Sequence, residues 1–470
     1  MSTTFPGWTS LFSGANAARA LALAGGVALQ AINIYIATTI LPSVVADIGG
    51  LDYYAWNTTL FVVASIVASA LSARFLRRSG PRGAYVVAAA LFGLGTLICA
   101  AAPSMPVMLA GRLVQGFGGG LLFALSYAMI RLIFDEALWP RAMALVSGMW
   151  GIATLVGPAV GGIFAEFDAW RAAFWSLIPV TALFALLAAI VLPRRGATDA
   201  APQPLPLAQL VLLTLAVLAV SAGSVPSGLA WNVAGVAAAA MLTGLLVWVE
   251  TGARQRLLPR RSFVVTTPLG ALYATMSLLA VAVTSTEIFV PLFLQVLHGQ
   301  SPLLAGYLAA LMAAGWTVGS IMSSGADARR VGRAILAAPA LALLGMATLA
   351  LLIPTPSGGE WAALGPICVA LFCVGFGVGL GWPHLLTRVL RTAPRDEQDL
   401  ASASITLVQL FASALGASVA GMVANIAGLT EPGGIAGTAG AARWLFAGFA
   451  LTPLLGLLTA ARIARQIGRR

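Results

Sequence analysis

Residues 267–297 read TPLGALYATMSLLAVAVTSTEIFVPLFLQVL, and this stretch decides the fold class. It runs for 31 residues with a single charged side chain, Glu287. A helix needs about 20 mostly apolar residues to cross the hydrocarbon core of a bilayer. A surface helix of a water-soluble domain instead carries charged residues along its outer face. The stretch therefore predicts a membrane-spanning helix, because open strands leave backbone groups unsatisfied in lipid.

The rest of the chain repeats this pattern. Of its 470 residues, 60% are apolar and only 9% are charged, whereas about a quarter of the residues in a soluble domain are charged. Fourteen apolar runs are long enough to span a bilayer, near residues 18–44, 55–76, 83–102, 106–132, 141–164, 171–193, 205–223, 229–250, 267–297, 303–324, 334–353, 361–387, 400–427 and 442–462. We therefore predict an all-α polytopic membrane protein with fourteen transmembrane helices, and we assign no role to the Gly- and Ala-rich loop 431–440.

The arginines predict how the chain crosses the membrane. They gather in alternate loops and at the C-terminus, near residues 74–82, 131–141, 194–195, 254–261, 329–333, 388–395 and 462–470. The opposite loops hold only Arg171 and Arg443, at helix starts. Because arginine-rich loops stay cytoplasmic, both termini are expected in the cytoplasm of a bacterium, with the chain in its inner membrane. This topology also explains the net charge of +11, so no nucleic-acid partner is expected.

An internal repeat divides the chain. The loop at 77–82 resembles the loop at 329–333, and the glycine-rich segment 157–162 resembles 416–421. We therefore predict two six-helix bundles, 1–195 and 267–470, related by a pseudo-two-fold axis. Residues 196–266 form a linker and an inserted two-helix hairpin. Such repeats place a binding site near the midplane, between the bundles.

Five motifs, in order along the chain, resemble the major facilitator superfamily and specifically its fourteen-helix drug:proton antiporter branch. They are GRLVQGFGGG at 111–120, GPAVGG at 157–162, WRAAF at 170–174, VPLFLQ at 290–295 and SPLLAG at 301–306. The resemblance covers nearly the whole chain. It implies alternating access to a cavity lined by the first, fourth, ninth and twelfth helices.

Two positions depart from the family pattern. The first helix usually carries an aspartate where this chain has Asn33, which places the usual proton carrier in doubt. The loop after the second helix usually has an acid where this chain has Arg77, three residues before Gly80, which places the usual gate latch in doubt. The gating residues implied by the resemblance are Arg77, Gly80, Gly157, Pro158, Gly161 and Gly162.

Three titratable or charged residues are candidates for proton coupling. Glu287 lies deep in an apolar run, where a charge is costly and usually marks a transport pathway or a proton relay. Arg112 cannot release its proton, so its role would be electrostatic, and His384 titrates near neutral pH. The alternatives are a packing role for Glu287, a structural role for Arg112 and an interfacial position for His384. Glu250 is set aside, because it lies at the edge of the hairpin near bulk water.

Several neutral side chains are candidates for substrate binding by hydrogen bonds. Those on the first, fourth and ninth helices are Gln30, Asn33, Thr38, Gln115, Thr284 and Gln295. Thr284, Glu287 and Gln295 share one face, because residues three or four apart in a helix are neighbours. The alternative is that these side chains bond between helices and hold them together.

Motifs of enzymes and ATP-driven pumps are missing from the sequence. It contains no P-loop and no cluster of ligands with metal-binding spacing, so we expect no metal, no cofactor and no enzymatic activity. We predict a monomeric secondary transporter that exports amphiphilic or cationic small organic molecules in exchange for protons. The alternatives are a lipid or natural-product exporter without proton coupling, and a membrane-embedded enzyme or scaffold.

Overall fold

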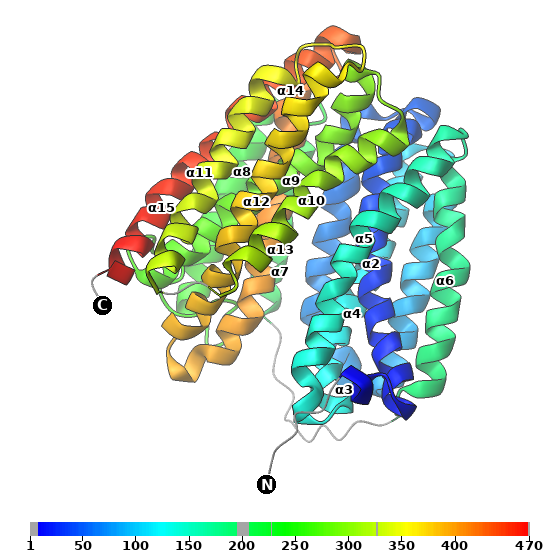
Figure 1. The fold of residues 1–470 in the computed structure, drawn as a ribbon, viewed down its shortest axis with the longest axis vertical. Helices are drawn as coiled ribbons and strands as arrows, with labels where there is room; N and C mark the ends of the chain where they lie inside the picture. Colours follow the sequence, from blue (N-terminus) through cyan, green and yellow to red (C-terminus); the bar gives the residue numbers. More distant parts are fainter. Residues whose placement is uncertain (1–7, 195–205, 227, 326–327, 469–470) are drawn as a thin grey trace. The chain divides into compact units, whose positions relative to one another are not determined.

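The computed structural model describes residues 8–194, 206–226, 228–325 and 328–468 and contains helices but no strands within them (Figure 1). The chain forms two compact units. Unit 1 comprises Met1–Gly49 and Leu60–Leu205, and unit 2 comprises Gly50–Thr59 and Pro206–Arg470. The predicted linker 196–204 lies outside the described residues.

The helices of the first part of the chain are α1 (Trp8–Leu11), α2 (Gly14–Ile48), η1 (Leu51–Tyr53), α3 (Trp56–Ala100), α4 (Met105–Ile133), η2 (Glu136–Leu138), α5 (Trp139–Glu166) and α6 (Trp170–Val191). Those of the second part are α7 (Leu207–Gly223), α8 (Leu229–Gly252), α9 (Pro268–His298), α10 (Pro302–Ser323), α11 (Ala328–Leu352), α12 (Trp361–Thr392), η3 (Arg395–Glu397), α13 (Gln398–Ile426), α14 (Gly434–Phe449) and α15 (Leu451–Gly468).

The predicted fold class is confirmed. Twelve helices within the described ranges are long and apolar enough to cross a membrane, and α7, with 17 residues, is a shorter apolar helix. One of the twelve, Leu51–Ala100, contains two of the predicted runs. If the two halves of Leu51–Ala100 are counted separately and α7 is added, there are fourteen helical segments in the described ranges, one for each predicted run.

The predicted loop after the second run is instead a sharp kink within α3. Gly80 has φ 67° and ψ 174°, and helix continues on both sides of it. Glycine adopts this left-handed φ without the steric cost that a Cβ atom would bring. Pro81 follows it at the start of the second half of α3, where its fixed φ suits the beginning of a helix.

The expected loop at 431–440 is wrong, because α14 already begins at Gly434. The glycine and alanine residues of this stretch favour a loop in the sequence, but in the structure they allow close packing between backbones. Ala441 and Ala442 are fully buried, and Gly437 faces the backbone of Gly428. The last predicted span therefore starts earlier than expected and consists of α14 and α15.

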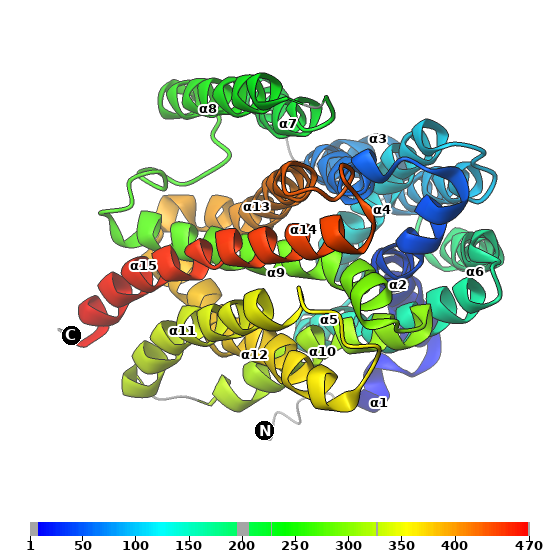
Figure 2. The same cartoon turned by 90° about the horizontal axis from the view of Figure 1, so that it is seen from above.

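The inserted hairpin packs within unit 2, where α7 and α8 lie side by side (Figure 2). Val220 of α7, Ala239 of α8 and Met422 of α13 form one apolar cluster. The hydroxyl of Ser221 also donates a hydrogen bond to Ser418 of α13 at 2.7 Å. Apolar contact and a buried hydrogen bond thus join α7 to α13.

Candidate functional site

The first candidate cluster is centred on α4 in unit 1. Arg112 is 2% exposed, and its Nη1 donates a 2.6 Å hydrogen bond to Oε1 of Gln115. Nε2 of Gln115 in turn donates to the hydroxyl of Thr96 at 2.8 Å. The Arg112 guanidinium also lies 4.2 Å from the ring centroid of Phe61, a cation–π contact. The structure brings the predicted residues Arg112 and Gln115 together and adds Thr96 and Phe61, which sequence reasoning missed.

Two predicted amide side chains on α2 belong to the same unit. Asn33 is 0% exposed, and neither its Oδ1 nor its Nδ2 has a hydrogen-bond partner among the described residues. Oε1 of Gln30 is likewise buried without a described partner, and it would lie 3.3 Å from a Cβ atom added at Gly119 of α4. Since a buried polar group without a partner costs about 1–3 kcal/mol, these amides can gain from a hydrogen-bonding ligand.

Thr38, the third candidate on α2, behaves differently. Its hydroxyl bonds to the backbone carbonyl oxygens of Ile34 and Tyr35 in its own helix, at 3.1 and 3.2 Å. This local bonding already satisfies the hydroxyl. Thr38 therefore has less to gain from a ligand than Gln30 and Asn33.

The second candidate cluster is on α9 in unit 2. Glu287 is half-buried, and its carboxylate forms no hydrogen bond or ion pair with the residues that the structure describes. Thr284, one turn away, donates to the hydroxyl of Ser413 on α13 at 3.0 Å. Nε2 of Gln295 is buried without a partner in the described ranges. The α9 face thus combines an acid and an amide that are both able to bind a ligand.

His384 lies on α12 rather than on α9. Its ring is half-buried, and Arg388 follows one turn later on the same helix. Its Nε2 has no hydrogen-bond partner in the part of the chain that the structure describes. His384 thus belongs to a different helix from Glu287.

The predicted gating residues lie on α3 and α5. Arg77 is half-buried, one turn before the Gly80 kink. On α5, a Cβ atom added at Gly161 would lie 3.1 Å from the carbonyl oxygen of Ile36 on α2. Gly157 faces Tyr35 of α2 in the same way, and the neighbouring Pro158 and Gly162 are buried. These small residues bring α2 and α5 into backbone contact.

The WRAAF element joins three helix ends of unit 1. Nη1 of Arg171 forms an ion pair with Oδ2 of Asp47 at 2.5 Å, and Nε1 of Trp170 donates to the same oxygen at 3.1 Å. Nη2 of Arg171 donates to the carbonyl of Ala102 at 3.0 Å. The motif therefore connects the start of α6 to the ends of α2 and α3.

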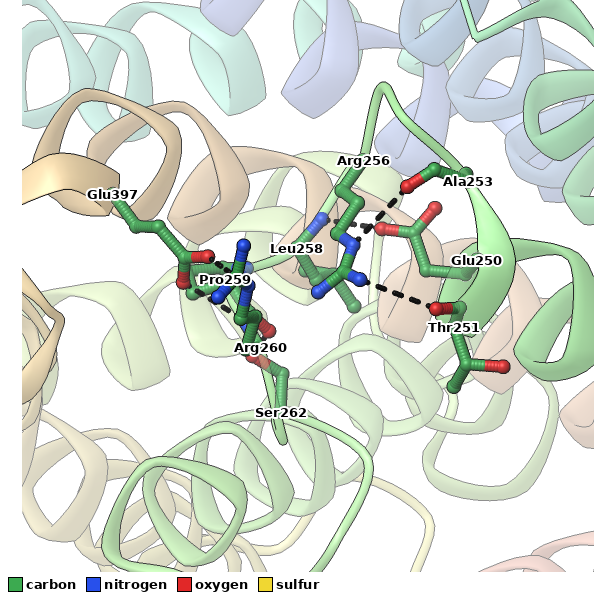
Figure 3. A network of polar contacts seen from close by, with 9 residues as sticks. All are labelled: Glu250, Thr251, Ala253, Arg256, Leu258, Pro259, Arg260, Ser262 and Glu397. Atoms are coloured by element: carbon green, nitrogen blue, oxygen red, sulfur yellow. Dashed lines mark hydrogen bonds and ion pairs between the residues drawn. The ribbon is translucent and has the colours of Figure 1, made fainter.

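Sequence reasoning missed a third polar network, which surrounds Glu250. The expectation that Glu250 lies near bulk water is wrong, because its side chain is buried. Glu250, at the end of α8, is 3% exposed. Its carboxylate accepts a hydrogen bond from the backbone N–H group of Leu258 at 2.7 Å (Figure 3). It also accepts from the backbone N–H group of Leu257 at 2.5 Å and from Nε2 of Gln209 at 3.3 Å. The segment after α8 folds back over this carboxylate and covers it. No local sequence pattern reveals the arrangement, because two of the donors are backbone groups.

Comparison with protein families and curated proteins gives concordant results. The family profile described as Major Facilitator Superfamily matches residues 23–417. A protein named probable multidrug-efflux transporter in Mycobacterium tuberculosis is 40% identical over 450 residues, covering 93% of this chain and 92% of that protein. Multidrug resistance protein 3 of Bacillus subtilis is 22% identical over 414 residues, which cover 86% of this chain and 78% of the relative.

Solved structures share the fold. The nucleoside transporter NupG superposes with a TM-score of 0.64 at 12% identity, covering 94% of this chain and 98% of NupG. A bacterial homologue of the human lysosomal transporter Spinster gives a TM-score of 0.63 at 17% identity, with 97% and 98% coverage. At this level of identity the likeness concerns the fold alone.

Proposed function

The chain belongs to the major facilitator superfamily, and we propose that it exports amphiphilic or cationic small organic molecules in exchange for protons by alternating access. It is a multi-pass membrane transporter rather than an enzyme. Drug export is supported by the 40% identical relative, whose name describes multidrug efflux. We place the chain in the inner membrane of a bacterium, with both termini in the cytoplasm, on the arginine distribution.

One observation carries the proton-coupling proposal. Glu287 lies in the middle of an apolar helix, and its carboxylate lacks a partner among the described residues. An ionised group inside a membrane is costly unless it is paired. The carboxylate is therefore stable when it carries a proton or binds a cationic substrate. Competition between the two for Glu287 is sufficient for antiport.

The Arg112 cluster has a different role in this proposal. Arginine stays protonated, so Arg112 orients Gln115 and contributes a fixed positive charge. Asn33 and Gln30 offer neutral amide groups to a substrate. The hydrogen-bonding groups needed for an amphiphile's polar end are thus present in unit 1.

Aromatic side chains continue the same α4 face toward its C-terminal end. Phe123 is two turns beyond Gln115, and residues at such spacing share a helix face. Its ring centroid lies 5.1 Å from that of Tyr127 and 6.3 Å from that of Trp150 on α5. All three side chains are half-buried. A polar cluster followed by an aromatic one fits an amphiphilic substrate.

Transport of a fluorescent cationic dye by the purified protein in liposomes tests the proposal. With a pH gradient, a proton-coupled exporter concentrates the dye, and without a gradient it only equilibrates the dye. Equal dye accumulation with and without the pH gradient would favour an exporter without proton coupling. The absence of transport for a broad set of amphiphiles would reject the export function.

A further inference from the structure

The segment 253–267, between α8 and α9, has a fixed shape although it contains no helix; we call it the strap. Glu250 holds its first half through the backbone N–H groups of Leu257 and Leu258, the second of which is drawn in Figure 3. Glu397, just before α13, holds its centre. The Glu397 carboxylate accepts from the Arg260 backbone N–H at 2.8 Å and pairs with Nε of the same residue at 3.2 Å. Two carboxylates thus fix the strap to unit 2.

The strap presents positive charge to its surroundings. The side chains of Arg254, Arg260 and Arg261 are exposed. Arg256 instead donates to the carbonyl oxygens of Ala253 and Thr251, at 3.3 and 3.2 Å (Figure 3). Glu397 pairs with Arg260, and neither Arg254 nor Arg261 has an ion-pair partner among the described residues.

Three consecutive apolar side chains follow these arginines. Phe263, Val264 and Val265 are all exposed, and none of them lies in a helix. Water-exposed loops seldom present such a run, whereas basic residues beside exposed apolar ones are typical of segments that lie in a membrane interface.

Two tryptophans on α8 place the strap at the membrane surface. Trp231 and Trp248 are 61% and 72% exposed, near the two ends of the helix. Their 17-residue separation corresponds to about 26 Å at 1.5 Å per residue, close to the thickness of the hydrocarbon core. Because exposed tryptophans collect at the two interfaces, the strap, which begins five residues after Trp248, lies at the level of the lipid headgroups.

We propose that the strap is a docking surface for anionic phospholipid, with Arg254 and Arg261 pairing with lipid phosphates while Phe263, Val264 and Val265 enter the acyl-chain boundary. A lipid is the occupant that fits best, because its phosphate complements the arginine charges and because the strap lies at the level of the headgroups. A free phosphate ion would use the arginines but gain nothing from the apolar run. A lipid of the adjoining leaflet uses both.

Native mass spectrometry of the purified full-length protein, titrated with phosphatidylglycerol or phosphatidylcholine, tests this inference. The wild-type protein should bind phosphatidylglycerol more tightly. Arg254→Gln/Arg261→Gln should weaken that binding about 30-fold, from about fivefold per arginine near an anionic surface. Phosphatidylcholine binding should change little. Arg462→Gln/Arg465→Gln on α15 removes the same charge elsewhere and should leave phosphatidylglycerol binding unchanged.

A second variant separates a lipid from a free anion. Phe263→Ser/Val265→Ser keeps every charge and should weaken phosphatidylglycerol binding, while millimolar inorganic phosphate should not displace the lipid from wild-type protein. Both strap variants keep the Glu250 and Glu397 contacts, so unchanged thermal unfolding would show that they fold. Wild-type lipid binding in the arginine variant, an equal loss in the α15 control, or displacement by phosphate would overturn the proposal.

Discussion

Arg112 and Gln115, one turn apart on α4, are joined by a 2.6 Å hydrogen bond from Nη1 to Oε1 inside unit 1. The guanidinium is a permanent positive charge that is almost inaccessible to water. Gln115 extends the hydrogen-bond network by donating from Nε2 to the hydroxyl of Thr96. The buried charge of Arg112 is therefore held by a neutral amide, which links the guanidinium to Thr96.

Removal of this amide should destabilise unit 1. Gln115→Ala leaves the buried guanidinium without one acceptor and Thr96 without its donor, and hydrogen bonds inside membranes contribute about 1–2 kcal/mol. We expect a lower midpoint of thermal unfolding in detergent. Thr38→Ala is the matched control, because the hydrogen bonds of Thr38 with the described residues lie within its own helix. An equal midpoint for the two variants would contradict the role given to Gln115.

Close packing of α4 against α3 should tolerate no side chain at Gly120. A Cβ atom there would lie 2.5 Å from Cα of Ser65, whereas one at Gly148 of α5 would meet nothing within 4 Å. Overpacking costs about 1–3 kcal/mol, so Gly120→Leu should lower the yield of monodisperse protein in size-exclusion chromatography. Gly148→Leu should behave like wild type. Equal yields would show that α3 and α4 do not pack as described.

The strap should lose its shape when Glu250 loses its charge. Glu250→Gln keeps the side-chain volume but turns one acceptor into a donor, and hydrogen bonds to charged groups are worth about 1.5–3 kcal/mol. We expect faster proteolytic cleavage between Ala253 and Thr267 than in wild type. Glu136→Gln, at an exposed position in η2, is the control. Unchanged cleavage would show that the Glu250 carboxylate does not hold the strap in place.

The fourteen-helix topology predicts that the two ends of α8 face opposite sides of the membrane. Leu229→Cys and Arg254→Cys, each on a background lacking Cys99, Cys368 and Cys373, place thiols at exposed positions. A membrane-impermeant reagent should label Cys at 229 in intact cells and label Cys at 254 only after the membrane is opened. Labelling of both in intact cells would contradict the inserted hairpin.

The spans could be predicted because length and apolarity act within one stretch of sequence. The polar contacts that fix the helices could not, since they join distant residues. Ser221 and Ser418 are 197 positions apart, and nothing near Ser221 marks its partner. The burial of Glu250 could not be predicted, because the backbone N–H groups that enclose it are carried by every residue but proline. Arg112, Asn33 and Glu287 could be identified because polar side chains are rare in apolar runs. Which residues they contact, and which of them lack a partner among the described residues, could be seen only in the structure.

The most direct test of proton-coupled export measures dye accumulation by Glu287→Gln protein in liposomes with an imposed proton gradient. Glutamine preserves the shape of the side chain but cannot exchange a proton or attract a cation. Wild-type protein should concentrate a cationic dye against its gradient, while the variant, reconstituted at equal density, should at most let the dye equilibrate. If Glu287→Gln protein still concentrates the dye, Glu287 is not the proton carrier, and the proposed coupling mechanism is wrong.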